Sequence, residues 1–126
     1  MAALAPQHPV ILIVEDEFLI RMATAEAIRD AGFEVVEAPD ADKAIAILET
    51  RSDIRVVFTD IHMPGSMDGA KLAHAVRHRW PPVRIIATSG RVSLEDLNLP
   101  ADTLIYPKPY SPEHVVSTPQ VLTGLN

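Results

Sequence analysis

The chain changes from apolar to polar within Phe58-Thr59-Asp60-Ile61-His62-Met63-Pro64-Gly65. An apolar run over 56–58 leads into a single acid, Asp60, and a Pro-Gly pair follows. Valine and phenylalanine in a short run favour a buried strand. Because a carboxylate is costly inside a core, we expect Asp60 where the strand ends, which is where parallel α/β sheets bind ligands. Taken alone, Asp60 is either the loop residue that finishes a strand or the reactive centre of the molecule.

Similar apolar runs recur on both sides of this stretch. Residues 10–14 are continuously apolar and β-branched, which is typical of a strand buried on both faces. The predicted strands cover 10–14, 34–38, 56–60, 83–88 and 103–106. A first helix is predicted over 18–31, a second after the cap Asp40, and a third over 69–79.

The spacing of apolar residues predicts one buried face for each helix. In the first helix the recurring apolar positions are Ile20, Ala23, Ala27 and Ala31. In the second they are Ala41, Ala44, Ile45 and Leu48. A fourth helix within 91–102 is expected to be short or irregular, because proline interrupts it early. A fifth is expected to be short or kinked near Pro119.

Alternating strands and helices predict an α/β fold with a parallel sheet and helices on both faces. Right-handed crossovers leave few topologies, and the flavodoxin-like order 2-1-3-4-5 puts the first and third strands side by side. In that order Asp16 and Asp60 lie together, although they are far apart in the sequence. The ends of the fourth and fifth strands bring Thr88 and Lys108 to the same edge.

The 126 residues suit one domain with a single core. We expect a mobile lead-in over 1–9, a domain over 10–118 and a tail over 119–126. The net charge of −6 argues against a nucleic-acid-binding surface, and the absence of cysteine excludes disulfides and thiol chemistry. The chain shows no signal-peptide pattern and no apolar stretch that could span a membrane, so the cytoplasm is the expected compartment.

The polar residues at the predicted strand ends suggest phosphoryl chemistry. The acids Glu15, Asp16 and Asp60 would repel one another, and a hard cation such as Mg²⁺, with Mn²⁺ as the alternative, would neutralise them. Asp60 could then act as an ionised nucleophile toward a phosphoryl group, which Lys108 and Thr88 would stabilise. The alternative is that Glu15 and Asp16 only begin a helix and that Lys108 is a surface lysine.

Four stretches resemble those of a response-regulator receiver domain, the phosphoacceptor module of bacterial two-component signalling. They are Ile13-Val14-Glu15-Asp16-Glu17, Thr59 to Gly65 with Met67-Asp68-Gly69, Ala87-Thr88-Ser89-Gly90, and Pro107-Lys108-Pro109-Tyr110. They occur in the order of the family, within 10–117. The resemblance implies Mg²⁺-dependent transfer from the phosphohistidine of a histidine kinase or histidine phosphotransfer protein. It also implies control of an unknown downstream protein.

The resemblance implies a role for each matching acid. Asp60 would be the phosphoacceptor, Asp16 would bind Mg²⁺ directly, and Glu15 would bind it mainly through water. The main-chain carbonyl of His62 would be a further metal ligand.

The resemblance also covers the groups that would contact the phosphate. Thr88 corresponds to the switch hydroxyl, and Ser89 would replace it if the strand register moved by one residue. Lys108 corresponds to the phosphate-binding lysine, and its peptide bond to the next proline is expected to be cis. The family usually has an aromatic residue three positions before this lysine. Ile105 stands there, and Tyr106 is expected to point to the other face of the strand.

We therefore expect a single-domain receiver without an output domain, a monomer or weak homodimer that promotes only its own phosphorylation and dephosphorylation. The alternatives are a receiver that only binds partners, a receiver fragment of a hybrid kinase, and a small-molecule phosphatase that forms an aspartyl phosphate. The phosphatase is disfavoured because His62 stands where such hydrolases place a second acid. His74 and His78, one helical turn apart, either bind a metal or belong to a solvated helix face.

Overall fold

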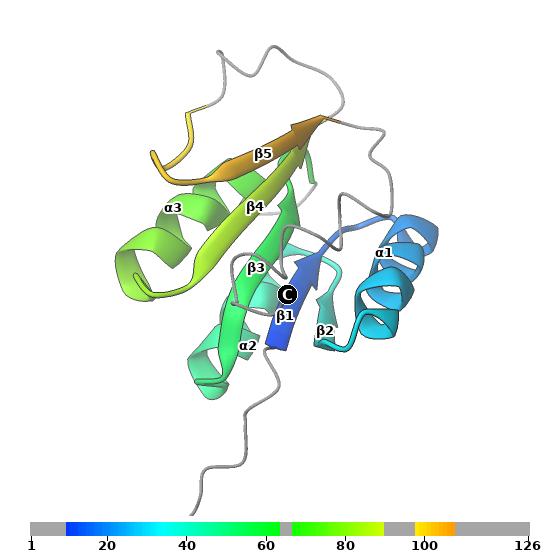
Figure 1. Cartoon of the computed structure of the whole chain (residues 1–126). Coiled ribbons are helices and arrows are strands. Elements are labelled where there is room, and N and C mark those ends of the chain that lie inside the picture. Colours follow the sequence, from blue (N-terminus) through cyan, green and yellow to red (C-terminus); the bar gives the residue numbers. More distant parts are fainter. Residues whose placement is uncertain (1–9, 64–66, 90–97, 108–126) are drawn as a thin grey trace, which may run out of the picture.

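The computed structural model describes residues 10–63, 67–89 and 98–107 (Figure 1). Its elements are β1 (Val10–Val14), α1 (Phe18–Asp30), β2 (Glu34–Ala38), α2 (Ala41–Thr50), β3 (Ile54–Asp60), α3 (Gly69–Arg79), β4 (Arg84–Ser89) and β5 (Leu104–Pro107). The predicted lead-in, tail and fifth helix lie outside the described residues. So does most of the predicted fourth helix, and its described part, 98–102, is not helical.

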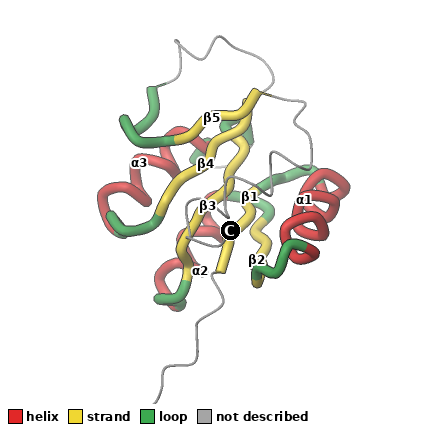
Figure 2. The backbone as a smooth tube through the Cα atoms, in the orientation of Figure 1, coloured by secondary structure: helices red, strands yellow, loops and turns green. Residues whose placement is uncertain are grey.

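The strands form one parallel sheet in the order β2-β1-β3-β4-β5, which confirms the predicted fold class and strand order (Figure 2). Strand β1 is buried at every position, because helices cover both faces of the sheet. β3 begins two residues earlier than predicted, at Ile54, and β4 and β5 each lie one residue later than predicted. Continuous apolar runs in the sequence thus correspond to strands without a solvent face.

Each face of the sheet carries its own cluster of buried side chains, because neighbouring strand residues point to opposite faces. On one face α1 covers a cluster that includes Ile11, Ile13, Phe58 and Ile86 (Figure 1). On the other face α2 and α3 cover a cluster that includes Leu12, Val57, Leu72 and Ile85. Full burial of one such side chain contributes about 1.5–3 kcal/mol, so the two clusters hold the strand ends in fixed positions.

The predicted apolar face of α1 is wrong by one position. The helix buries Thr24, Ala25 and Ile28, whereas Ala23 is exposed. Apolar residues occur on several sides of the first turns of this helix, so their spacing fits more than one face. Packing against the sheet buries only one of these faces and leaves Phe18, Leu19 and Met22 exposed.

The other two helices agree with the prediction. Asp40 caps α2 by accepting a hydrogen bond from the amide of Lys43 at 2.8 Å, and α2 buries Ala41, Ala44 and Leu48. Asp68 caps α3 in the same way, accepting from the amide of Lys71 at 2.9 Å. Trp80 follows α3 and packs against the core. Within the described ranges, none of the helices has the length and apolar character needed to cross a bilayer.

Candidate functional site

Three carboxylates meet at the carboxyl edge of the sheet. Glu15 and Asp16 come directly after β1, and Asp60 is the last residue of β3. One carboxylate oxygen from each residue lies within 4.8 Å of the other two. Glu15 is 4% and Asp60 is 6% exposed, whereas Asp16 is exposed to solvent. The predicted meeting of Asp16 and Asp60 is therefore confirmed, with Glu15 beside them.

This acidic cluster fits a hard divalent cation. Carboxylates this close repel one another, and a cation bound through oxygen atoms offsets the repulsion. Mg²⁺ binds proteins through one or two carboxylates and keeps several waters, which the exposed side of Asp16 allows. Glu15, Asp16 and Asp60 are therefore the candidate metal ligands.

Main-chain hydrogen bonds fix the segment that carries Asp60. The amide of Ile61 donates to the carbonyl of Thr88 at 2.9 Å, and the carbonyl of Ile61 accepts from the amide of Gly69 at 2.8 Å. The amide of His62 donates to Oδ1 of Asp60 at 3.3 Å. A bond from an amide to a carboxylate is charge-assisted, so it orients the Asp60 side chain as well as its loop.

The first residue of α3 lies against the end of β3. A Cβ atom at Gly69 would overlap the carbonyl oxygen of Asp60 and would lie 2.7 Å from Cα of Ile61. Both neighbours are main-chain atoms, which cannot move aside as the end of a flexible side chain can. Glycine at position 69 is what allows α3 to begin this close to Asp60.

Thr88 lies beside Asp60 in the sheet. The strand register pairs Asp60 with Thr88 and Thr88 with Tyr106, so the three side chains share one face. Ser89 points to the opposite face, and its buried hydroxyl makes no hydrogen bond within the described part of the chain. Tyr106 packs against the α1-side cluster, and burial raises the pKa of its phenol. Ile105 is turned to the opposite face. The expectation that Tyr106 would point away from the site is therefore wrong, because the pairing of β5 with β4 places Tyr106, and not Ile105, on the face of Thr88 and Asp60.

The structure does not test the predicted roles of Lys108 and of the His62 carbonyl. Lys108, with its bond to Pro109, lies outside the described residues, so its role as the phosphate-binding lysine stays a prediction. The side chain of His62 is exposed, and its amide contacts Asp60. The predicted metal contact of the His62 carbonyl stays a prediction.

The two histidines of α3 do not form a metal site with a third residue in the described ranges. His74 and His78 are both exposed, as expected for a solvated helix face. Nε2 of His74 lies 2.9 Å from the carbonyl oxygen of Asn98. This contact joins α3 to the segment before β5.

Arg21 on α1 supports the acidic loop and was not predicted from the sequence. Its Nη1 donates to the main-chain carbonyl of Glu15 at 2.8 Å, and its Nε donates to Glu37 on β2 at 3.3 Å. The side chain is only 15% exposed, so both bonds are shielded from solvent. The amide of Glu17 also donates to Oε2 of Glu15, at 3.1 Å. Arg21 thus joins the loop that carries the candidate metal ligands Glu15 and Asp16 to β2.

We expect Arg21→Gln to weaken Mg²⁺ binding about tenfold, because residues that orient metal ligands commonly have effects of this size. Arg29→Gln is the matched control. Arg29 also contacts Glu37, at 3.2 Å, but its other bond goes to the carbonyl of Val35 and not to Glu15. Calorimetric titration with MgCl₂ at constant ionic strength measures both affinities. Wild-type affinity in Arg21→Gln would show that Arg21 supports only the fold.

Comparison with known proteins identifies relatives of the chain. A family model described as the response regulator receiver domain matches residues 11–117. The sensor kinase CckA of Brucella abortus is 35% identical over 114 residues, which cover 86% of this chain and 12% of that protein. The hydrogenase transcriptional regulatory protein HoxA of Cupriavidus necator is 31% identical over 119 residues, which cover 91% of this chain and 24% of that protein. The chain thus spans only a small part of these curated relatives.

Solved structures of similar chains have the same fold. A response regulator receiver protein from Sinorhizobium medicae superposes with a TM-score of 0.84 at 28% identity, covering 97% of this chain and 100% of the other. A CheY-like receiver domain protein from Methanospirillum hungatei gives a TM-score of 0.82 at 27% identity, covering 94% and 97%.

Proposed function

The chain belongs to the response regulator receiver domain family, and from this premise we propose that Asp60 accepts a phosphoryl group from the phosphohistidine of a partner protein. Receiver domains act in two-component signalling, and members of the family are typically signalling phosphoacceptors rather than catalysts. Membership also implies interaction with histidine kinases or phosphotransfer proteins. The observation that supports the proposal best is the meeting of Glu15, Asp16 and Asp60 within 4.8 Å.

In the proposed reaction a carboxylate oxygen of Asp60 attacks the phosphorus atom of the donor phosphohistidine. An O–P bond forms while the P–N bond breaks, and the donor imidazole leaves with the electron pair and takes up a proton from water. The bond from the amide of His62 keeps the carboxylate oriented for this attack. Thr88 and Lys108 would contact the phosphoryl oxygens. The register of Thr88 with Asp60 supports the first contact, and the family resemblance supports the second.

Bound Mg²⁺, or Mn²⁺ in its place, would offset the negative charge of the carboxylates and of the phosphoryl group. Glu15, Asp16 and Asp60 would hold the ion, with the carbonyl of His62 as a further ligand. The burial of Glu15 and Asp60 strengthens their attraction for a cation, because solvent screens it less.

Incubation with acetyl phosphate, followed by intact-mass measurement with and without Mg²⁺, tests the proposed function. We expect a gain of one phosphoryl group that requires Mg²⁺. No gain from acetyl phosphate or from a phosphorylated phosphotransfer protein would contradict the proposal and favour a domain that only binds partners. Repeated turnover of a phosphomonoester would instead favour the phosphatase alternative.

The exposed apolar residues at the start of α1 suggest where the donor binds. The exposed fractions are 60% for Phe18, 71% for Leu19 and 38% for Met22. These residues follow the acidic loop directly, and a donor must cover the rim of that loop to bring its phosphohistidine to Asp60. Large apolar side chains exposed together are typical of protein contacts. We therefore expect the donor to contact this turn of α1.

Leu19→Ala is expected to slow phosphotransfer from a phosphorylated phosphotransfer protein about tenfold, because it truncates the most exposed of these side chains. The rate with acetyl phosphate should not change, because this small donor needs no protein contact. Leu104→Ala on β5, where Leu104 is 40% exposed, is the matched control and should leave both rates unchanged. An equal effect of Leu19→Ala on both donors would locate the defect in the site itself.

We propose that the protein acts in the cytoplasm as a monomer or weak homodimer. A stand-alone receiver and a receiver segment of a hybrid kinase both fit the comparisons, because the match to the sensor kinase covers 12% of that protein. The domain limits at residues 10 and 118 stay predictions.

A further inference from the structure

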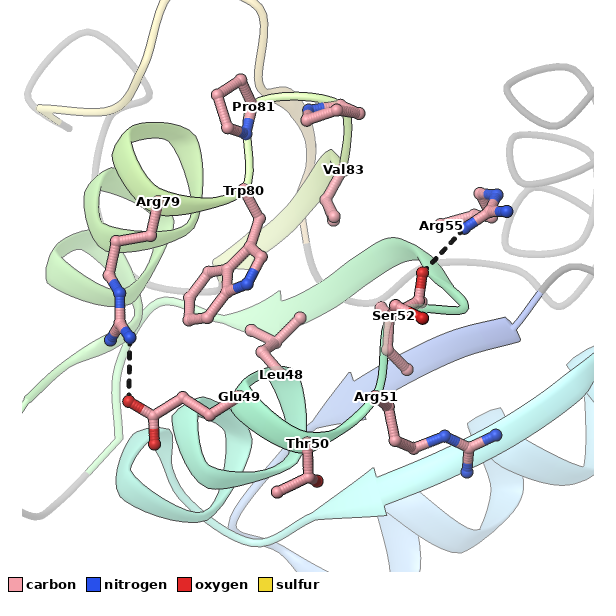
Figure 3. A pocket seen from close by; sticks show the side chains of 12 residues that line it. Leu48, Glu49, Thr50, Arg51, Ser52, Arg55, Arg79, Trp80, Pro81 and Val83 are labelled. Atoms are coloured by element: carbon pink, nitrogen blue, oxygen red, sulfur yellow. Dashed lines mark hydrogen bonds and ion pairs between the residues drawn. The ribbon is translucent and has the colours of Figure 1, made fainter.

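A cavity of about 670 Å³ lies at the amino edge of the sheet, at the opposite end of β3 from Asp60. It opens between the C-terminal ends of α2 and α3 and the starts of β3 and β4 (Figure 3). This volume is in the range of small-molecule sites. The apolar part of its lining consists of Leu48, Ile54, Trp80, Pro81, Pro82 and Val83.

Two of the three arginines that line this cavity are engaged in ion pairs. Nη2 of Arg79 lies 2.8 Å from Glu49, and its guanidinium lies over the Trp80 ring, 4.4 Å from the centroid. Arg51 lies 2.8 Å from Asp53 and also pairs with a glutamate of β2, and in Figure 3 it extends away from Trp80. These two positive charges are therefore already matched by carboxylates.

Arg55, the third arginine, has no carboxylate within ion-pair distance among the described residues. Its side chain is exposed, and Nη1 donates to the carbonyl of Ser52 at 3.3 Å (Figure 3). The hydrogen bond from Arg51 lowers the pKa of Asp53, and the positive charge of Arg55 lowers it further. Arg55 therefore places a positive charge, with no ion-pair partner among the described residues, beside the apolar part of the cavity lining.

We propose that this cavity binds a small organic monocarboxylate whose carboxylate pairs with Arg55 and whose aliphatic or aromatic body covers the apolar lining. The planar guanidinium matches a carboxylate in a forked geometry. A single available charge favours a monoanion over a phosphate ester. The C-terminal ends of α2 and α3, which carry partial negative charge, also disfavour a multiply charged ligand. The proposal is independent of the phosphoryl transfer at Asp60.

Trp80 makes a direct test possible, because it is the single tryptophan of the chain and lines the cavity. Hydrocinnamate is titrated into the full chain while Trp80 fluorescence is recorded. We expect a saturable change. The neutral amide of hydrocinnamate should bind at least about fivefold more weakly than the acid, because it lacks the negative charge. Formate should also bind at least about fivefold more weakly than hydrocinnamate, because it lacks the apolar body. Inorganic phosphate should also bind more weakly than hydrocinnamate.

Arg55→Gln should weaken hydrocinnamate binding by about fivefold, whereas Arg29→Gln, on the opposite face of the sheet, should not weaken it. Thermal unfolding of each variant checks that the fold is retained. The absence of a saturable change in the wild type would overturn the proposal. So would equal affinities for the acid and its amide, for hydrocinnamate and phosphate, or for the wild type and Arg55→Gln.

Discussion

Asp60→Asn is expected to abolish phosphoryl uptake and to leave the fold intact. The amide has the shape of the carboxylate and can still accept the hydrogen bond from the amide of His62. It is neutral, so it neither attacks phosphorus nor contributes a full charge to a metal site. Intact mass after incubation with acetyl phosphate and Mg²⁺ should therefore show one added phosphoryl group in the wild type and none in the variant.

A matched control separates this loss from a general effect of removing one negative charge. Asp30, at the exposed end of α1, is far from the acidic cluster, and Asp30→Asn should be phosphorylated like the wild type. Normal labelling of Asp60→Asn would show that another residue accepts the phosphoryl group. Circular dichroism of both variants should match the wild type.

Gly69→Ala is expected to destabilise the domain and to impair the site, although alanine is the better helix former by about 1 kcal/mol. The added Cβ would overlap the carbonyl oxygen of Asp60, and overpacking of this kind costs about 1–3 kcal/mol. The steric term opposes the propensity term and exceeds it, so stability falls. The displaced atoms belong to Asp60 itself, and we expect its phosphorylation to slow about tenfold or more. Urea unfolding and rates with acetyl phosphate measure the two effects.

Gly32→Ala is the comparison variant. Alanine at this position strains the backbone but meets no neighbouring atom within the described residues, whereas alanine at position 69 overlaps the main chain of Asp60. Gly32 has φ +103°, and among the described residues other than Gly32 and its two chain neighbours no heavy atom lies within 4 Å of the position its Cβ would take. The substitution strains the backbone by roughly 1–3 kcal/mol but leaves the end of β3 untouched. Stability should fall while the phosphorylation rate stays normal. A normal rate in Gly69→Ala would show that the contact with Asp60 matters only for packing.

Local sequence patterns were sufficient for most of the architecture. The apolar run 10–14 indicated a strand buried on both faces, and the structure buries every residue of it. Asp40 indicated the start of α2, and its carboxylate forms the cap. The spacing of apolar residues was not sufficient to predict the buried face of α1. The predicted face was displaced by one residue from the observed one. A helix with apolar residues on several sides fits the same spacing in more than one orientation.

The contacts that support the site could not be predicted in the same way. Arg21 contacts Glu15 and Glu37 through bonds that depend on how α1 lies over β1 and β2. Gly69 was predicted as the start of a helix, but nothing local indicated that its backbone would touch Asp60. Both contacts join residues from different elements, so they appear only when those elements are packed.

By itself, the sequence determined the alternation of strands and helices and the four motifs that mark the family. These features follow from local pattern and chain order. The flavodoxin-like strand order then predicted that Asp16 and Asp60 lie together at the ends of neighbouring strands. Only the tertiary structure decided which face of α1 is buried and how the acidic loop is held. It alone decided that a cavity forms at the far end of β3. The physical reason is that several packings satisfy the same periodicity, and only the combined fit of all elements selects one of them.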